Sequence, residues 1–181
     1  MSFRDAALDN ESMYFKAKDG QNKVRIISEE TAVWTQFNKE TNKALKFLDE
    51  ATVKEHLKTL PDNKDKGIQT KKQYAFWVID RADGKVKIME AGAMIMSQIQ
   101  SLAKDEDYGF DTLPNYDIKI GKTGTGLETQ YDVRNSPASE LTDAERAIVM
   151  GLESVADFLK KQPGMVEAKP LTDDQGNNIP F

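Results

Sequence analysis

Two segments with strand spacing, joined by one turn signal, restrict the fold of this chain more than any other feature. Over the run from Lys72 to Asp80, the side chains of Lys72, Tyr74, Phe76 and Val78 share one face at a period of two, which is typical of a β-strand. Ala82-Asp83-Gly84 then supplies a turn, and an apolar segment returns from Val86 to Met89. The sequence therefore predicts a β-hairpin over residues 72–90.

The rest of the chain contains short segments with either strand or helix spacing. We expect further strands over residues 23–28, 32–37, 116–120 and 129–133, and helices over residues 52–60, 93–103 and 142–161. A capping-box pattern marks the start of two of these helices, at Thr52 with Glu55 and at Thr142 with Glu145. Five or six short strands with added helices fit a mainly β fold, a five-stranded Greek-key barrel of the OB type. Periodicity does not separate this barrel from another α+β arrangement.

Length and composition limit the function as well. The 181 residues suffice for one domain with an appendage, and 39% hydrophobic against 30% charged residues is the balance of a soluble globular protein. There is no cysteine and a single histidine, His56, which excludes disulfides, thiolate nucleophiles and zinc sites built from these residues. No apolar run reaches the roughly 18 residues of a membrane span, and Met1 to Asp9 lacks the apolar core of a secretory signal. We therefore expect a cytoplasmic protein.

Charge is distributed unevenly along the chain. The formal net charge of −5 argues at first against a nucleic-acid partner. Residues 14–90, however, hold 16 Lys and Arg against 12 Asp and Glu, a net of +4, whereas the remaining residues carry −9. A basic body between acidic flanks is compatible with an anion-binding surface, and also with a solvated surface of mixed charge.

The motifs that carry enzyme chemistry are incomplete. Gly121 to Gly126 contains Gly-Lys-Thr, but a phosphate-binding loop needs a glycine where Tyr116 stands, and a dinucleotide fingerprint needs one where Thr129 stands. We interpret this segment as a glycine-rich hairpin loop. Its cationic neighbours that can contact phosphates are Lys119, Lys122 and Arg134. Because Asp105-Glu106-Asp107 also lacks the ligand spacing of a calcium loop, we expect no enzyme activity, cofactor or metal.

Aromatic and basic residues interleave in the predicted strands. Single-stranded nucleic acid is held by cations that contact phosphates and by aromatic faces on which bases stack, each stack contributing ~1–3 kcal/mol. Lys71-Lys72-Gln73-Tyr74-Ala75-Phe76-Trp77 places two lysines beside three rings, and Arg25 and Trp34 stand on neighbouring strands. Alternation puts Tyr74 and Trp77 on opposite faces, and the sequence leaves open which face is the core.

Three groups of strand residues, taken in order, resemble one known family. The residues that carry the likeness are Tyr14-Phe15-Lys16 and Val24-Arg25-Ile26, then Tyr74-Ala75-Phe76-Trp77, and finally Tyr116-Asp117-Ile118-Lys119-Ile120 with Tyr131-Asp132-Val133. Their order and spacing resemble the phage single-stranded-DNA-binding, helix-destabilising proteins over about residues 13–135. The resemblance implies an OB-fold that binds single strands without sequence preference and protects them during phage replication, recombination and repair.

The carboxyl terminus has a second resemblance. Asp173 and Asp174 precede the last residues Ile179, Pro180 and Phe181, and this ending is similar to the acidic tip of bacterial single-stranded-DNA-binding proteins. The similarity implies recruitment of replication and repair proteins through a terminal carboxylate beside an apolar ring. The larger phage proteins also carry a Cys/His zinc subdomain, which this chain has no cysteine to form.

These observations lead to one leading interpretation. We expect an OB-fold domain over residues 1–138 with an inserted basic segment at 39–72, a carboxyl-terminal helix within 139–163, and an acidic disordered tail over 164–181. The residues expected to contact phosphates are Arg25, Lys71, Lys72, Lys119, Lys122 and Arg134, and those expected to stack on bases are Trp34, Tyr74, Trp77 and Tyr131. The alternative is a protein-interaction adaptor whose terminal helix mediates assembly. The oligomeric state, a homo-oligomer included, stays open.

Overall fold

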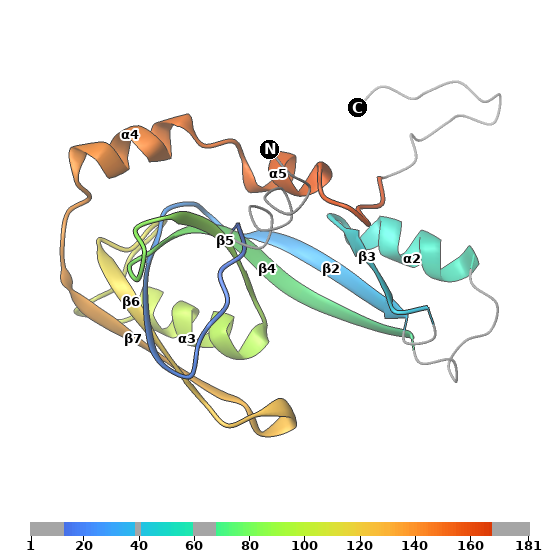
Figure 1. The fold of residues 1–181 in the computed structure, drawn as a ribbon, viewed down its shortest axis with the longest axis horizontal. Coiled ribbons are helices and arrows are strands. Elements are labelled where there is room, and N and C mark those ends of the chain that lie inside the picture. The colour runs from blue at the N-terminus through green and yellow to red at the C-terminus, as the bar shows by residue number, and fades with distance from the viewer. Residues whose placement is uncertain (1–12, 39–40, 60–67, 168–181) are drawn as a thin grey trace, which may run out of the picture. The chain divides into compact units, whose positions relative to one another are not determined.

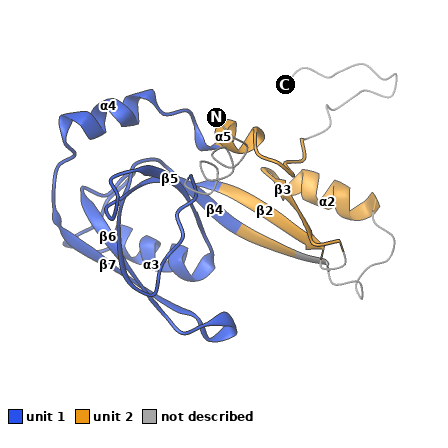
Figure 2. Ribbon diagram, viewed as in Figure 1, with its two compact units in different colours: residues 1–31, 73–155 blue, residues 32–72, 156–181 orange. Residues whose placement is uncertain are grey.

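The structure of the protein is a computed structural model that describes residues 13–38, 41–59 and 68–167. The chain divides into two compact units (Figure 2). Unit 1 comprises residues 1–31 and 73–155, and unit 2 comprises residues 32–72 and 156–181. Each unit is therefore assembled from two separate parts of the chain.

Unit 1 is built on an antiparallel sheet (Figure 1). Its strands are β1 (Gly20–Ile26), the second part of β4 (Ile68–Asp80), β5 (Val86–Ala91), β6 (Tyr116–Thr123) and β7 (Gln130–Ala138). Strand β5 pairs with β4, β4 with β1, β1 with β6, and β6 with β7. Helix α3 (Ala93–Ala103) stands in the chain between β5 and β6, and α4 (Asp143–Gly151) follows β7.

The hairpin predicted over residues 72–90 is confirmed as β4 and β5. In its register Trp77 lies opposite Ile88. Gly84 adopts a φ of 71° in the turn, and its N–H donates to the backbone oxygen of Asp80 at 2.7 Å. Lys87 Nζ lies 2.7 Å from carboxylate oxygens of both Asp80 and Asp83, so the turn is held by charge as well as by backbone geometry.

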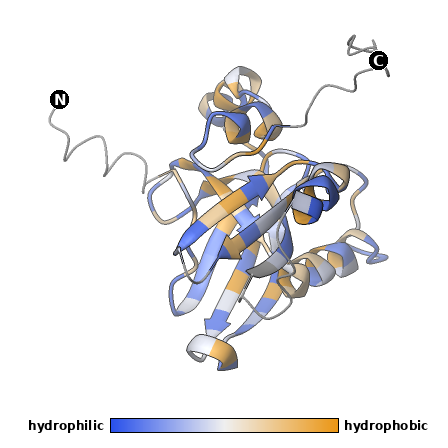
Figure 3. Cartoon of the chain, turned by 90° about the vertical axis from the view of Figure 1, so that its right-hand side faces the viewer, coloured by the Kyte–Doolittle hydropathy of each residue, from blue (hydrophilic) through white to orange (hydrophobic). Residues whose placement is uncertain are grey.

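The core of unit 1 occupies one face of its sheet. Val24, Ile118 and Ile120 point to that face from β1 and β6, and Phe76 and Val78 point to it from β4. Helix α3 closes the same face with its own buried residues, Ile95, Met96 and Ile99. Hydrophobic and hydrophilic residues alternate along the strands, as Figure 3 shows. On the other face, β1, β6 and β7 carry charged side chains such as Lys23, Lys119 and Arg134, whereas β4 and β5 carry the buried apolar residues Trp77, Ile79 and Ile88.

Unit 2 contains a second antiparallel pair, β2 (Thr31–Asn38) and β3 (Lys43–Phe47), with helices α2 (Glu50–Thr59) and α5 (Val155–Lys160). Strand β2 stands between β3 and β4 in the strand order. Its register places Trp34 opposite Phe47. Among the described residues of this unit, the buried apolar ones are Val33, Phe47, Val53, Phe158 and Leu159.

Two helix predictions are wrong in detail. Thr52 is not a cap, because α2 begins at Glu50 and the Thr52 N–H donates to Asp49 Oδ1 at 2.7 Å. The capping box of Thr142 with Glu145 is confirmed, but the single helix expected to reach residue 161 is two helices. Helix α4 ends at Gly151, where glycine lowers helix propensity, and Leu152 is extended with ψ 136°.

Other predictions meet mixed outcomes. The helix at 93–103 is confirmed as α3 with the same ends, and the strands at 23–28, 32–37, 116–120 and 129–133 are confirmed with shifted ends as β1, β2, β6 and β7. Strand β3 was not predicted from the sequence. The tail expected to be disordered over residues 164–181 is hydrogen-bonded at its start, where the Lys46 N–H donates to the Gly164 oxygen and the Val166 N–H donates to the Lys46 oxygen, each at 2.8 Å. From residue 168 it lies outside the described residues.

Candidate nucleic-acid interface

Three cationic side chains form a row across the outer face of unit 1. Lys23 on β1 lies opposite Lys119 on β6, and Lys119 lies opposite Arg134 on β7. All three are exposed, because the core occupies the other face of these strands. Opposite residues on neighbouring strands have Cβ atoms roughly 4.5–5.5 Å apart, so the three side chains are close neighbours. We call Lys23, Lys119 and Arg134 the cationic row.

Acidic neighbours reduce the charge of the cationic row only in part. Arg134 Nε lies 2.6 Å from Oδ2 of Asp132, and Lys23 Nζ lies 3.8 Å from Oδ2 of Asp117. Within the described ranges, Lys119 has no acid at ion-pair distance. Like charges on adjacent strands repel one another unless an anion binds between them. The row is therefore suited to a phosphate.

Lys122 and Tyr131, which were predicted together with Lys119 and Arg134, point to the opposite face of the same hairpin. They lie opposite each other in the register of β6 and β7. The Tyr131 ring packs against the hydrophobic core, and Lys122 Nζ lies 3.7 Å from Oδ1 of Asp19. The four predicted residues therefore divide into two pairs, one on each face, and a ligand lying on one face meets one pair.

Arg25 belongs to a buried network of ion pairs. Its side chain is 3% exposed, and its Nε donates to Oδ1 of Asp117 at 2.8 Å. Its Nη2 donates to the hydroxyl of Ser139 at 2.7 Å and to the Ser139 carbonyl oxygen. Arg25 therefore has a structural role: its guanidinium is buried and holds Asp117 and Ser139 in place.

Arg81 shares the same carboxylate. Its Nε and Nη2 donate to the two oxygens of Asp117, each at 3.1 Å, and its Nη1 donates to Glu145 on α4. We call Arg25, Arg81, Asp117 and Glu145 the Asp117 cluster. Two arginines and two carboxylates balance in charge, so the cluster is neutral as a whole.

The carboxylates of the Asp117 cluster stay ionised at neutral pH. Burial would raise the pKa of Asp117, but hydrogen bonds from Arg25 and Arg81 and the charges of both arginines outweigh it and lower the pKa below its usual value. Burial also opposes ionisation of Glu145, but hydrogen bonds from Arg81 and from the Thr142 backbone lower its pKa as well. An anion that approaches Arg81 consequently competes with a charged Glu145.

Three of the four rings expected to stack on bases lie against the core or under other residues. Trp77 is 2% exposed, and its indole N–H donates to the backbone oxygen of Glu153 at 3.0 Å. Tyr74 and Tyr131 are half-buried and pack against the hydrophobic core. The structure thus settles the face of β4: Phe76 and Val78 point into the core, and Trp77 is covered on the other side.

The fourth ring lies in unit 2 beside a lysine. Trp34 on β2 is half-buried, and Lys72 Nζ lies 5.1 Å from the centre of its ring, a cation–π contact. Lys71 and Lys72 are both exposed. A ring beside a cation combines a stacking surface with a phosphate contact. We call these residues the Trp34–Lys72 pair.

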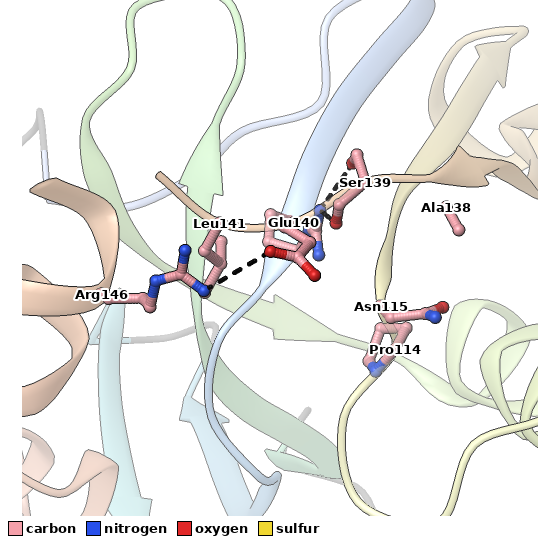
Figure 4. A pocket seen from close by; sticks show the side chains of 8 residues that line it. Pro114, Asn115, Ala138, Ser139, Glu140, Leu141 and Arg146 are labelled. Atoms are coloured by element: carbon pink, nitrogen blue, oxygen red, sulfur yellow. Dashed lines mark hydrogen bonds and ion pairs between the residues drawn. The ribbon is translucent and has the colours of Figure 1, made fainter. Parts of the chain in front are cut away.

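An open hollow of about 520 Å³ lies beside the Asp117 cluster in unit 1 (Figure 4). Figure 4 shows Arg146 of α4 directed toward Glu140, and their charged groups are 3.8 Å apart. The hollow is lined by Arg25, Pro114, Asn115, Ala138, Ser139, Glu140, Leu141 and Arg146. Because Glu140 offsets Arg146 and Arg25 is already paired, we assign it no ligand of its own.

Features considered for other chemistry have structural roles. Oδ1 of Asp105 accepts hydrogen bonds from the N–H groups of Asp107 and Tyr108 at 2.8 and 3.0 Å, so this acidic segment is a turn. Gly121 to Gly126 ends β6 and opens the turn to β7, as expected for a hairpin. Over residues 13–38, 41–59 and 68–167, no group of three or more His, Asp and Glu side chains is placed to hold a metal ion. No helix in these ranges is long and apolar enough to cross a membrane.

Two cationic residues of this surface are absent from the set predicted from the sequence: Lys23 of the cationic row and Arg81 of the Asp117 cluster. Lys23 directly precedes the buried Val24, so strand alternation alone indicates that its side chain is exposed. Arg81 follows β4, and its N–H donates to the backbone oxygen of Lys23 at 2.9 Å. That neighbourhood depends on strand pairing between distant segments, which the sequence does not reveal.

Comparison with known proteins adds one finding. No protein-family model matches the chain. The chain is similar to a protein of Escherichia phage T5 described as a probable ssDNA-binding protein, with 41% identity over 73 residues. This match spans 40% of the chain and 28% of the phage T5 protein. The match agrees with the resemblance to phage single-stranded-DNA-binding proteins that the strand residues indicate.

Proposed function

We propose that this protein binds single-stranded DNA without sequence preference and coats it stoichiometrically. The observation that carries the proposal is the 41% identity over 73 residues to the probable ssDNA-binding protein of phage T5. The cationic row adds physical support, because it presents three neighbouring cations on an otherwise acidic chain of net charge −5. Binding through phosphates alone is independent of base sequence.

We further propose that unit 1 is an OB-type barrel. Its pairings, β1 with β4, β4 with β5, β1 with β6 and β6 with β7, are compatible with a partly open five-stranded Greek-key barrel. The position of α3 between the third and fourth of these strands also supports this assignment. Strands β2 and β3 and helix α2 are then an insertion between the first and second barrel strands.

The binding residues that the geometry favours are fewer than those expected from the sequence. Phosphates would contact the cationic row and the lysines Lys71 and Lys72, all of which are exposed. A base would stack on Trp34, whose ring is partly accessible. We leave Arg25 and Trp77 out of the contact surface, because both are at least 97% buried.

The deciding experiment is a titration of the full chain with oligo-dT, followed by tryptophan fluorescence and repeated at several salt concentrations. Binding should weaken as salt rises, with log K falling by about 0.7 per phosphate contact for each unit of log salt. Absence of binding at low salt would sink the proposal. Indifference to DNA together with salt-insensitive association with another protein would favour the adaptor alternative.

We also propose roles in phage DNA replication, recombination and repair, with partner proteins recruited by the carboxyl-terminal tip. The tip residues Asp173, Asp174 and Ile179 to Phe181 lie outside the described residues, so this proposal rests on the sequence. Deleting Ile179 to Phe181 should abolish binding of a replication protein and leave DNA affinity unchanged or higher. Weaker DNA binding by the deletion variant contradicts this role.

A further inference from the structure

The cationic row continues beyond β1 to a fourth cation. The N–H of Arg81 donates to the backbone oxygen of Lys23. Arg81 therefore lies beside Lys23 at one edge of β1, and Lys119 lies beside Lys23 at the other edge. The Arg81 and Lys23 side chains both approach Oδ2 of Asp117, at 3.1 and 3.8 Å. Arg81, Lys23, Lys119 and Arg134 therefore form one line of charge across four neighbouring chain segments.

Asp117 holds the Arg81 guanidinium in one orientation. Nε and Nη2 donate to its two oxygens as a fork, which fixes the plane of the group. The remaining edge, at Nη1, faces Glu145. The side chain of Arg81 is 24% exposed and that of Glu145 is 18% exposed, so solvent and ions reach their contact. Arg81 thus has one fixed edge and one edge available for exchange.

Helix α4 presents Glu145 without being packed into the core itself. None of its residues from Asp143 to Gly151 is buried. Its amino end is stabilised by the capping box, in which Glu145 Oε2 accepts the Thr142 N–H at 3.0 Å. A side chain on so lightly packed a helix can change partners without disturbing buried residues.

We propose that Arg81 is a fourth phosphate-binding residue, and that a DNA phosphate replaces the Glu145 carboxylate on its Nη1 edge. The proposal rests on the proposed DNA-binding function. Arginine binds phosphate and carboxylate with the same planar donor geometry, so one anion substitutes for the other without rearranging the guanidinium. Glu145 thereby lowers the affinity for DNA in the free protein, because the phosphate competes with it.

The test compares Glu145→Gln with the matched control Asp143→Asn. Both variants remove one negative charge from α4, but the Asp143 side chain is fully exposed and pairs within the helix with Arg146. Glutamine also preserves the capping box. In oligo-dT titrations at fixed salt, E145Q should bind about three- to fivefold more tightly than the wild type, and D143N should bind within about twofold of it.

A third variant links the effect to Arg81. Arg81→Gln should weaken oligo-dT binding and reduce the salt slope by about 0.7, the loss of one phosphate contact. Introducing E145Q into the R81Q variant should then give no further gain, because the competing pair no longer exists. Thermal unfolding of each variant, followed by circular dichroism, verifies that it is folded at the titration temperature.

The outcomes separate this inference from the function on which it rests. If the wild type does not bind oligo-dT, the proposed function fails. If the wild type binds but E145Q equals D143N, or E145Q raises affinity equally in the R81Q background, the exchange of anions at Arg81 is refuted and DNA binding stands. An R81Q variant that is folded and binds with unchanged affinity and salt slope also refutes it.

Discussion

The Nζ of Lys72 lies 5.1 Å from the centre of the Trp34 ring, whereas the chain's other tryptophan, Trp77, is 2% exposed and donates its indole N–H to Glu153. The two tryptophans therefore differ in what a ligand can reach. Trp34 offers part of its ring beside a cation, which is the combination that single-stranded nucleic acid requires. Trp77 is buried, and a ligand does not reach its ring.

This difference predicts which tryptophan reports DNA binding. Trp34→Phe should abolish the fluorescence change on addition of oligo-dT, and Trp77→Phe should retain it. Trp34→Ala should weaken binding by about 1–3 kcal/mol, the contribution of one stacked base. Fluorescence and anisotropy titrations of each variant with labelled oligo-dT measure the fluorescence change and the affinity. A fluorescence change that persists in W34F and vanishes in W77F would place the stacking surface elsewhere.

The cationic row predicts a change in salt dependence. Lys119→Gln should lower the slope of log K against log salt by about 0.7, because one phosphate contact is lost. Lys119 is the member of the row without an acidic partner among the described residues, so its removal leaves no carboxylate unpaired. Fluorescence anisotropy with labelled oligo-dT at several salt concentrations gives the slope.

Lys104 provides the matched control for that measurement. It is exposed at the end of α3, whose buried residues pack on the core face, opposite to the cationic row. Lys104→Gln removes the same charge from the same unit and should leave the slope unchanged. Equal slopes for K104Q and K119Q would mean that overall charge, and not the row, governs binding.

Local sequence patterns predicted most of the strands, but they did not predict strand β3 or the end of helix α4. The hairpin of β4 and β5 was predictable because alternation and a glycine turn agree over a short distance. Strand β3 was not, since its five residues from Lys43 to Phe47 include two lysines, which are uncommon in strands, and owe their conformation to pairing with β2. The break after Gly151 was also missed, because apolar spacing continues through it to Leu159.

The candidate site depended on information that local patterns lack. Lys119 and Lys122 are three residues apart on one strand, so they face opposite ways, and this could be predicted from the sequence alone. That Lys23 stands beside Lys119 follows from the pairing of β1 with β6, which are far apart in the chain. The burial of Arg25 likewise depends on Asp117 and Ser139, two residues brought in by tertiary contacts.

Asp117 predicts an acid-sensitive contribution to stability. Asp117→Asn at pH 7 should lower the free energy of unfolding by about 3 kcal/mol, because it leaves the buried Arg25 without its charged partner. The pKa of Asp117 is lowered in the folded state, so its contribution is present above the unfolded-state pKa and is lost as pH falls through the folded-state pKa.

Urea unfolding of wild type and D117N at a series of pH values measures this contribution. The difference between the two proteins should be largest near neutral pH and should shrink at acidic pH, where the wild-type carboxylate becomes protonated. Asp143→Asn, which changes an exposed carboxylate, should show no such dependence. A difference between wild type and D117N that stays constant with pH would contradict the role of the ion pairs.

Two glycines of the β6–β7 turn predict unequal effects of the same substitution. Gly124 has a φ of 78°, and a Cβ there would lie 2.3 Å from the backbone oxygen of Glu128. Gly126 also has a positive φ, 57°, but a Cβ there would meet nothing within 4 Å. Gly126→Ala therefore carries only the conformational cost, about 1 kcal/mol, whereas Gly124→Ala adds a backbone clash and should cost about 2 kcal/mol or more.

Urea unfolding of the two glycine variants, followed by circular dichroism, compares these costs directly. Because the turn joins the strands that carry Lys119 and Arg134, G124A should also weaken oligo-dT binding more than G126A does. The register of these two residues depends on the turn, since one displaced residue moves a side chain to the other face of its strand. Equal loss of stability in both variants would show that the turn relaxes around Gly124 without transmitting strain to the strands.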